Sequence, residues 1–451
     1  MRLMRVYQIG VLLCGLLCPV VVLSQVFSIT PSLTVGARYD DNIFQSDADK
    51  EDDFITVITP AIVLRYAPSR ETEIDFNYEP SFQFFADQTD ENQISHRLTL
   101  GLEAALSRRL QVALSDRFTI TEEPSERDRD IILEDGTRGR SDEEREQTIR
   151  NYATSELRFQ LAPRSSIGLL FENLIEDVED PDEVDEVRYT VGTEVSYFTH
   201  IQRQNRVLLA FTTDIFNFEG NPDPDADPDA QIPDEDDFLV HTASVGYEHH
   251  LSPTLTTTAR LGYSFTAGLD SEDGDQNSGI VGSIGLEKLL RTGSASIRYA
   301  RSLTSGGGIG GQVVADRVVT QIATNLSPKI TAGLGANVTL LDFQEEEDDD
   351  QDRVYFTIRP SLSYQVLRPL RLSASYDFAT NIFDEPINPD WTEHRAIFES
   401  RLIFRKGWSM ALAYEYRTRS FEDEAERSRE FDEFTRNRVF LSVTYGPTFR
   451  F

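Results

Sequence analysis

The chain alternates apolar and polar side chains over many short segments. Between residues 72 and 85, apolar residues hold one parity, and acidic and amide residues hold most of the other. Successive side chains of a β-strand point to opposite faces, so this period of two predicts a strand with one apolar and one polar face. The alternation recurs at 98–106, 255–267 and 330–340. Each segment is long enough for a tilted strand that crosses a membrane.

Short and long connections alternate between these segments. The short ones have the Pro, Ser and Gly content of tight turns, whereas the long ones are mostly acidic. Short turns at one end and long loops at the other are typical of a bacterial outer-membrane barrel. The pattern predicts an all-β, antiparallel, up-and-down transmembrane barrel of about 20 strands (18–20), with both termini on the periplasmic, short-turn side. The long loops are expected at 40–53, 121–151, 176–187, 217–237, 269–277, 342–352, 379–393 and 418–435.

A soluble β-solenoid or β-sandwich is the alternative fold. The hairpin spacing varies widely, whereas a solenoid repeats at a fixed period. A soluble sheet with one solvated face also rarely continues through so many strands without a second, fully buried type. The last strand keeps its apolar residues on one parity and ends in Phe451. This ending resembles the signal that the outer-membrane barrel assembly machinery reads, so that machinery is an expected partner.

The N-terminus has the order of a secretory signal peptide. Basic residues precede an apolar stretch, and Ser24 follows it. We therefore predict a signal peptide at 1–24 and an outer-membrane barrel at 25–451, located in the bacterial outer membrane. Cys14 and Cys18 lie in the signal peptide, and each follows a Leu where lipoprotein processing needs a small residue. A lipid anchor is thus disfavoured.

The formal net charge is −34, from 43 basic and 77 acidic residues. Nucleic acid is excluded as a partner, because binding it requires a basic face. Most of the charge lies in the predicted loops. Their carboxylates would bind Ca²⁺ or Mg²⁺ and bridge to lipopolysaccharide phosphates, or would form a solvated layer of negative charge. The weak metal candidates are Asp223, Asp225, Asp227 and Asp229, and no other cofactor is expected.

The polar parity of the strands near the C-terminus carries many arginines. If these line the lumen, they would form an electropositive track for carboxylated or sulfated sugars, because a guanidinium group binds such anions in a bidentate manner. Alternatively, they pair with Asp377, Glu399 and Glu415 on the same face and brace the wall. The lumen-lining candidates are Arg353, Arg359, Arg371, Arg395, Arg401, Arg417, Arg436 and Arg438.

A short motif follows the first strand. It reads Tyr39-Asp40-Asp41-Asn42-Ile43-Phe44, and Thr59-Pro60 sits in the second strand. This opening resembles that of the β-barrel porin 2 family of Gram-negative outer-membrane proteins, some of which are encoded with exopolysaccharide synthesis and export systems. The resemblance implies an outer-membrane barrel and carries over no catalytic residue. Weaker matches to this motif occur at Asn381-Ile382-Phe383 and Asp214-Ile215-Phe216. They predict hairpins that place aromatic residues at the outer membrane interface.

Motifs for catalysis are missing from the sequence. The six histidines are scattered, and neither His-Glu-x-x-His nor Gly-x-Ser-x-Gly occurs. We expect no enzyme. The leading hypothesis is a wide channel for surface polysaccharide export, with polysaccharide and periplasmic export components as partners. The alternatives are a general or anion-preferring diffusion porin, and a structural or adhesive barrel without transport. In each case, residues 121–151 would either fold into the bore or stay outside it.

Overall fold

The computed structural model describes residues 26–47, 50–121, 147–178, 184–198, 205–220, 237–268, 278–305, 312–343, 353–383, 390–421 and 433–451. Nearly all of them belong to strands. No helix among the described residues is long and apolar enough to cross a membrane. The elements are β1 (Val26–Asp40), β2 (Asp53–Ser69), β3 (Thr72–Phe85), the 3-10 turn η2 (Thr89–Glu91), β4 (Gln93–Ala105), β5 (Leu110–Thr121), β6 (Thr148–Ala162), β7 (Ser165–Val178), β8 (Val184–Phe198), β9 (Asn205–Gly220), β10 (Phe238–Ser252), β11 (Leu255–Gly268), β12 (Ser278–Leu290), β13 (Gly293–Ser305), β14 (Gln312–Ser327), β15 (Ile330–Phe343), β16 (Arg353–Leu367), β17 (Leu370–Phe383), β18 (Trp391–Arg405), β19 (Trp408–Phe421), β20 (Phe434–Tyr445) and β21 (Phe449–Arg450).

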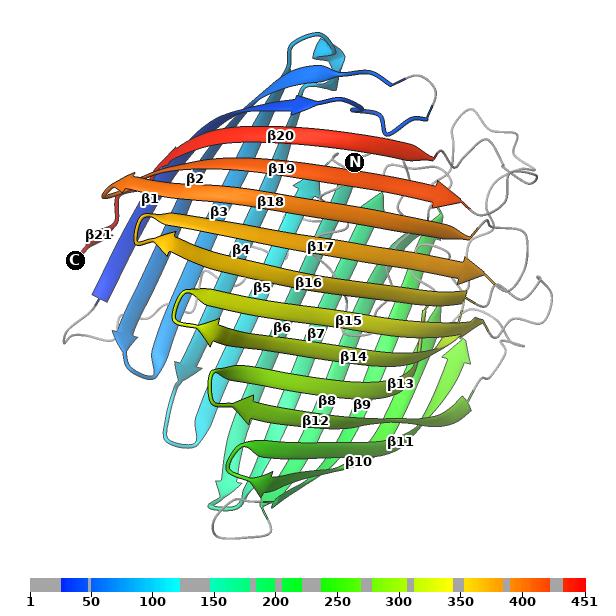
Figure 1. Cartoon of the computed structure of the whole chain (residues 1–451). Helices are drawn as coiled ribbons and strands as arrows, with labels where there is room; N and C mark the ends of the chain where they lie inside the picture. Colours follow the sequence, from blue (N-terminus) through cyan, green and yellow to red (C-terminus); the bar gives the residue numbers. More distant parts are fainter. Residues whose placement is uncertain are drawn as a thin grey trace, which may run out of the picture.

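The strands form one closed antiparallel barrel (Figure 1). Each strand from β1 to β19 pairs with the next along the chain, and β1 also pairs with β20, up to Asp40↔Arg438. The two-residue β21 continues the last strand beyond Pro447, which has no N–H to donate, and pairs with β1 at Ser28 and Ile29. The predicted antiparallel barrel of about 20 strands is therefore confirmed.

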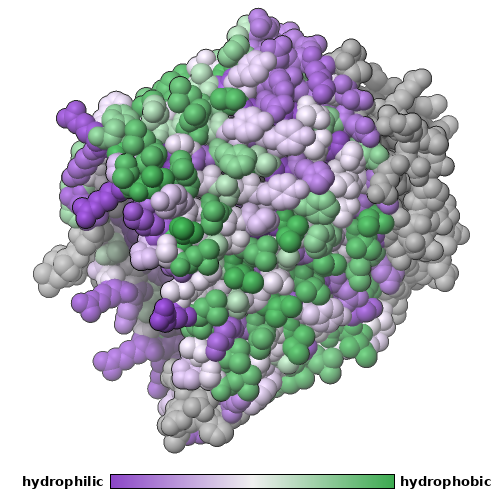
Figure 2. Space-filling model, in the orientation of Figure 1, coloured by the Kyte–Doolittle hydropathy of each residue, from purple (hydrophilic) through white to green (hydrophobic). Residues whose placement is uncertain are grey.

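One face of most strands carries large exposed apolar side chains. On β11, Leu261 is 62% exposed and Tyr263 is 51% exposed, whereas Ser264 on the opposite face is buried. Figure 2 shows such apolar residues spread over one side of the barrel. An apolar surface of this extent is unfavourable in water and matches the lipid-facing band of a membrane barrel.

Several strands continue into segments that the sequence assigned to loops. β7 extends to Val178, and β17 extends to Phe383. β18 already begins at Trp391 and β19 continues to Phe421, so the predicted loops at 379–393 and 418–435 were too long. The apolar parity ends where the lipid band ends, but backbone hydrogen bonding continues beyond it. A hydropathy pattern therefore marks the membrane-facing part of a strand rather than its full length.

The other face of the strands lines the lumen. On β16, Arg353, Tyr355 and Thr357 lie near the long-loop end and are buried, whereas Ser361 lies closer to the short-turn end and is exposed. β14 and β19 show the same gradient. Since the short turns of such barrels face the periplasm, the lumen is most open toward the periplasm and most densely packed toward the outside.

The C-terminal residue takes part in barrel closure. The backbone N–H of Phe451 donates to the carbonyl of Phe27 at 2.8 Å, and the N–H of Phe27 donates back at 3.2 Å. The two rings lie 6.2 Å apart, and the Phe451 side chain is 73% exposed. Its recognition by the assembly machinery remains a prediction.

Candidate functional site

The eight predicted arginines lie at two heights on the inner wall. We call these the outer level, near the extracellular ends of the strands, and the open level, near the periplasmic turns. Arg353, Arg395, Arg417, Arg436 and Arg438 are buried near the extracellular ends of their strands. The other three, Arg359, Arg371 and Arg401, lie closer to the periplasmic turns, where the lumen is open.

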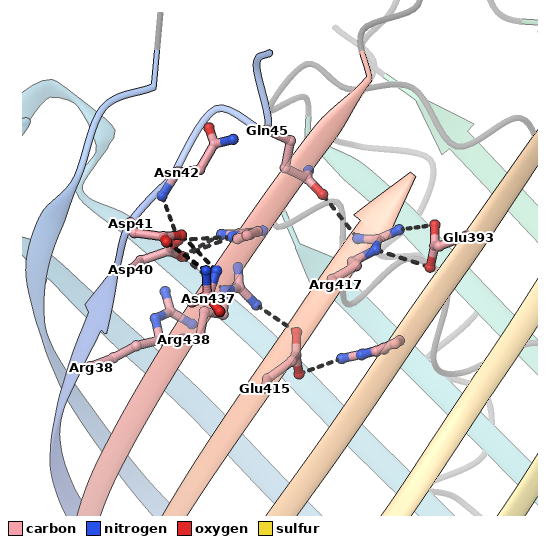
Figure 3. Close-up of polar contacts among 12 residues, drawn as sticks. Arg38, Asp40, Asp41, Asn42, Gln45, Glu393, Glu415, Arg417, Asn437 and Arg438 are labelled. Atoms are coloured by element: carbon pink, nitrogen blue, oxygen red, sulfur yellow. Dashed lines mark hydrogen bonds and ion pairs between the residues drawn. The ribbon is translucent and has the colours of Figure 1, made fainter. Parts of the chain in front are cut away.

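A buried carboxylate holds the outer level together where β1 meets β20 (Figure 3). Asp40 has no exposed surface. It accepts from Nε of Arg436 at 2.9 Å and 3.0 Å, one distance for each carboxylate oxygen, and from Nε of Arg438 at 2.8 Å. A carboxylate without water needs such charged donors to remain ionised.

Two further carboxylates extend this network across β18 and β19. Glu415 accepts from Nη2 of Arg395 at 2.8 Å and lies 3.7 Å from Nη1 of Arg438. Glu393 accepts two hydrogen bonds from Arg417, at 3.0 Å and 2.8 Å, and one from Arg419 at 3.0 Å. We name these residues the seam cluster: Asp40, Glu393, Arg395, Glu415, Arg417, Arg419, Arg436 and Arg438.

The motif of residues 39–44 connects the end of β1 to this cluster. Asp41 accepts from the backbone N–H of Asn437 at 2.6 Å and from its Nδ2 at 2.7 Å. Asn42 donates from Nδ2 to the carbonyls of Ser46, at 2.7 Å, and Thr435, at 3.2 Å. The motif thus ties the loop after β1 to the last strand.

The apolar half of the motif is packed rather than exposed. Ile43 is 1% exposed and lies in a cluster with Ile55, Val57 and Phe85, against which Phe44 packs. Tyr39, on the lipid-facing parity of β1, instead contacts Phe54, with ring centroids 4.9 Å apart and the ring planes tilted by 45°.

One of the two weaker matches to the motif does not lie where it was expected. Phe216 was predicted to sit at the outer membrane interface, but it is 1% exposed and packs on Phe238 with ring centroids 4.7 Å apart. Its even parity on β9 faces the lumen, because Leu209 and Phe211 hold the lipid-facing parity. The prediction for Phe216 was therefore wrong, since a motif match fixes no parity.

Sequence reasoning missed three members of this site. Glu393 and Arg419 lie in segments that were assigned to loops, and Gln45 received no role. In the structure, Gln45 has a φ of 57° and accepts from Nη1 of Arg417 at 3.0 Å. Arg417, Arg419 and Phe421 continue the period of two, so following this period would have extended the predicted strand to Phe421.

Most arginines at the open level have a carboxylate beside them. Arg359 lies 2.7 Å from Asp377, and Arg401 lies 3.1 Å from Glu399. Arg371 donates to the amide oxygen of Gln365 at 3.3 Å. The contacts of Arg359 and Arg371 join β16 to β17, whereas Arg401 and Glu399 lie on the same strand. Each of these half-exposed contacts contributes little in water.

Charge is nevertheless unevenly distributed around the described lumen wall. We define the arginine sector as the lumen face of β16–β20 and the acidic sector as that of β7–β9, where β8 is ten strands from β18 in either direction. The arginine sector has nine arginines against four carboxylates, and the acidic sector has four carboxylates against two arginines. The arginine sector consists of Arg353, Arg359, Arg371, Arg395, Arg401, Arg417, Arg419, Arg436 and Arg438 with Asp377, Glu393, Glu399 and Glu415. The acidic sector consists of Glu172, Glu176, Glu194 and Asp214 with Arg188 and Arg206.

Metal binding receives no support from the described part of the chain, in which no group of three or more His, Cys, Asp or Glu side chains is arranged to hold an ion. The candidates Asp223, Asp225, Asp227 and Asp229 lie outside the described residues, as does most of segment 121–151.

Comparisons with known proteins place the fold. No protein-family model matches the chain, and no curated protein matches it. The solved structure of a mutant of the ferric enterobactin receptor of Pseudomonas aeruginosa (PfeA), in complex with enterobactin, is 9% identical over 93% of this chain and 81% of that chain, with a TM-score of 0.52. A PfeA complex with BCV-L6 is 10% identical over the same shares, with a TM-score of 0.51. OccK11 (OpdR) of the same organism is 12% identical over 93% of this chain and 96% of that chain, with a TM-score of 0.42. The likeness to PfeA shows the fold of an outer-membrane β-barrel.

Proposed function

We infer that the protein is an outer-membrane channel for polar solutes that carry anionic groups. The observation that supports this most directly is the charge distribution of the open part of the lumen. A polar wall that is exposed toward the periplasm holds water, and rings of basic side chains favour anions in such pores. Arg371 and Arg401 are exposed there, on the arginine sector.

Export of an anionic surface polysaccharide is the narrower form of this proposal. Its support is the position of the arginines, which follow β16–β20 from the seam cluster down to the open level. An extended acidic polymer would pass successive guanidinium groups, each able to bind a carboxylate or sulfate. The resemblance of residues 39–44 to the porin 2 family agrees with this substrate class.

The test is conductance in planar bilayers with oligogalacturonate, an acidic sugar polymer, added on the periplasmic side. We expect steady conductance with current blockades from the polymer. The double variant Arg371→Gln/Arg401→Gln should lose most blockades. The double variant Arg158→Gln/Arg260→Gln has the same change in net charge at exposed lumen positions outside the arginine sector, and should keep them.

Each outcome decides one form of the proposal. Absence of conductance from correctly folded protein would contradict the channel. Steady conductance without blockades, or equal loss in both double variants, would contradict a polysaccharide track while leaving a diffusion channel. A gene deletion that leaves secreted polysaccharide unchanged would reject export.

A further inference from the structure

Basic residues occupy four consecutive periplasmic turns. Arg291 lies between β12 and β13, Lys329 between β14 and β15, Arg368 between β16 and β17, and Lys406 between β18 and β19. We call these four residues the basic arc. Figure 1 shows the four turns side by side along one edge of the barrel. Successive turns are two strands apart, about 10 Å across the sheet, so the arc follows the rim of the lumen from β12 to β19.

The basic arc is exposed and is not neutralised by acidic residues. All four residues are exposed, and none of the four turns contains Asp or Glu. No ion pair joins any of them to a carboxylate in the part of the chain that the structure describes. In contrast, Arg359 and Arg401 each have a carboxylate beside them. The arc is therefore a surface of four cationic groups that an anionic partner can reach from the periplasm.

Backbone hydrogen bonds hold the turns of the arc in a fixed row. A carbonyl in each turn accepts, at 2.8 Å, from a backbone N–H near the next periplasmic turn or, for the last turn, just after β20. The acceptors are Thr292, Lys329, Pro369 and Gly407, and the donors are Asn325, Gln365, Ile403 and Gly446, in the same order. Gly407 also adopts the φ of 80° that favours glycine in its turn. The backbone spacing of the four bases is thus set before any partner binds, which lowers the entropy cost of binding.

The arc lies at the periplasmic border of the lipid-facing surface. The last large apolar residue before each turn is exposed and marks the edge of the apolar band; these residues are Leu290, Leu326, Leu367 and Phe404. The bases follow them in the chain. They therefore stand where the wall meets periplasmic water, around the opening of the lumen.

The arc continues into the arginine sector at the open level. Arg368 is three positions before Arg371, and Lys406 is five positions after Arg401. Arg371 and Arg401 are directly opposite each other on β17 and β18. Cationic groups therefore follow one another from the periplasmic rim into the lumen.

We propose that the basic arc is a capture site for acidic polysaccharide at the periplasmic mouth, from which the polymer passes to Arg371 and Arg401. A row of cationic groups without a carboxylate is complementary to a polymer that carries a carboxylate or sulfate on successive sugars. One exposed charge contact is weak, but contacts that one polymer makes together add up. The proposal rests on the proposed function for its substrate class. It adds the side of the membrane from which the polymer enters.

Binding of fluorescent oligogalacturonate to the protein in nanodiscs of phosphatidylcholine tests the arc. The quadruple variant Arg291→Gln/Lys329→Gln/Arg368→Gln/Lys406→Gln should bind about tenfold more weakly, because several weak contacts that act together are lost. The double variant Arg291→Lys/Arg368→Lys keeps the charge and should keep the binding, which separates the effect of charge from damage to the turns.

The matched control makes the same change in net charge at turns between β2 and β7. It is Arg70→Gln/Arg108→Gln/Arg109→Gln/Arg164→Gln, and it should bind as tightly as the unchanged protein. Equal losses in the two quadruple variants, or no loss in either, would overturn the arc as a site.

Planar-bilayer recordings with the polymer on the periplasmic side separate capture from transport. The arc variant should show fewer blockades of unchanged duration, because exposed rim charges act mainly on the rate of association. The blockades that remain in Arg371→Gln/Arg401→Gln should instead be shorter. Arc-dependent binding in nanodiscs without any blockade would support the capture site and contradict transport. An unchanged blockade frequency in the arc variant would overturn the capture site and leave the channel.

Anionic phospholipid is the other partner that such a row of bases could take. Phospholipid that copurifies with the unchanged protein is measured by mass spectrometry and compared with that of the quadruple arc variant. Loss of this lipid from the variant, together with equal binding of oligogalacturonate by the two proteins, would assign the arc to lipid head groups and overturn the proposal.

Discussion

Asp40 shows how one side chain joins the two ends of a long chain. It lies at the end of the first strand, and its partners Arg436 and Arg438 lie on the last. All three groups are buried, so each charge depends on the others for compensation. Asp41 and Asn42 add backbone-directed hydrogen bonds at the same junction. The acidic residues at the end of β1 therefore contribute to barrel closure.

Replacing Asp40 with Asn should destabilise the barrel strongly. The amide keeps the shape but leaves two buried guanidinium groups without their carboxylate, a change that typically costs about 3–5 kcal/mol. The measurement is the free energy of unfolding in urea, in detergent micelles. Asp52→Asn is the control, because Asp52 is exposed and its bond to the Tyr39 hydroxyl is 3.2 Å long. Similar unfolding of the two variants would show that Asp40 has no special role.

The seam between β1 and β20 also depends on a close approach of the two strands. Gly36 faces the lumen opposite Ser442, and a Cβ there would lie 2.6 Å from a carbon of the neighbouring Phe440 ring and 2.8 Å from the carbonyl oxygen of Leu441. Only glycine allows the ring to lie across β1. The pairing of β1 with β20, which closes the barrel, thus depends on both buried ion pairs and close packing.

Gly36→Ala should therefore impair closure. Overpacking of this kind costs about 1–3 kcal/mol, and here one of the clashing atoms is backbone that cannot rotate away. Gly335→Ala provides a matched control in β15, because a Cβ there meets nothing closer than Cβ of Arg359 at 3.9 Å. The fraction of folded barrel on unheated gels should fall for Gly36→Ala alone. An equal effect of both variants would contradict a role for the close contact.

In the molecule as a whole, most charged side chains of the lumen pair locally, but positive and negative charges are unevenly distributed around the wall. Most arginines have a nearby carboxylate, as Arg359 has Asp377. The arginine sector still carries an excess of positive charge opposite the acidic sector. Bracing and an anion-binding wall, which the sequence posed as alternatives, are compatible in one barrel.

This field should act on solutes only at low ionic strength. The screening length falls from about 10 Å in 0.1 M salt to about 3 Å in 1 M salt, which is short relative to a wide lumen. Blockades by oligogalacturonate should therefore become rare when KCl is raised between these concentrations. The Arg371→Gln/Arg401→Gln variant should show a weaker salt dependence. A blockade frequency that does not change with salt would contradict electrostatic binding.

The sequence was enough to predict the barrel, its approximate strand number and which face of each strand is apolar. These follow from local rules, because side-chain parity and turn composition depend only on neighbours along the chain. It also indicated that the arginines near the C-terminus share the polar face. It did not indicate that Asp40 meets Arg436, or that Glu393 and Arg419 belong to strands at all.

The seam cluster and the close contact at Gly36 follow from the tertiary structure alone. Asp40 and Arg436 are 396 positions apart, and their contact depends on closing the full circle of strands in register. Leu303 of β13 lies in one cluster with Phe216, Phe238 and Val240 of β9 and β10, a contact that no periodicity in β13 encodes. Local alternation specifies the wall of this barrel, whereas closure and long-range packing specify its sites.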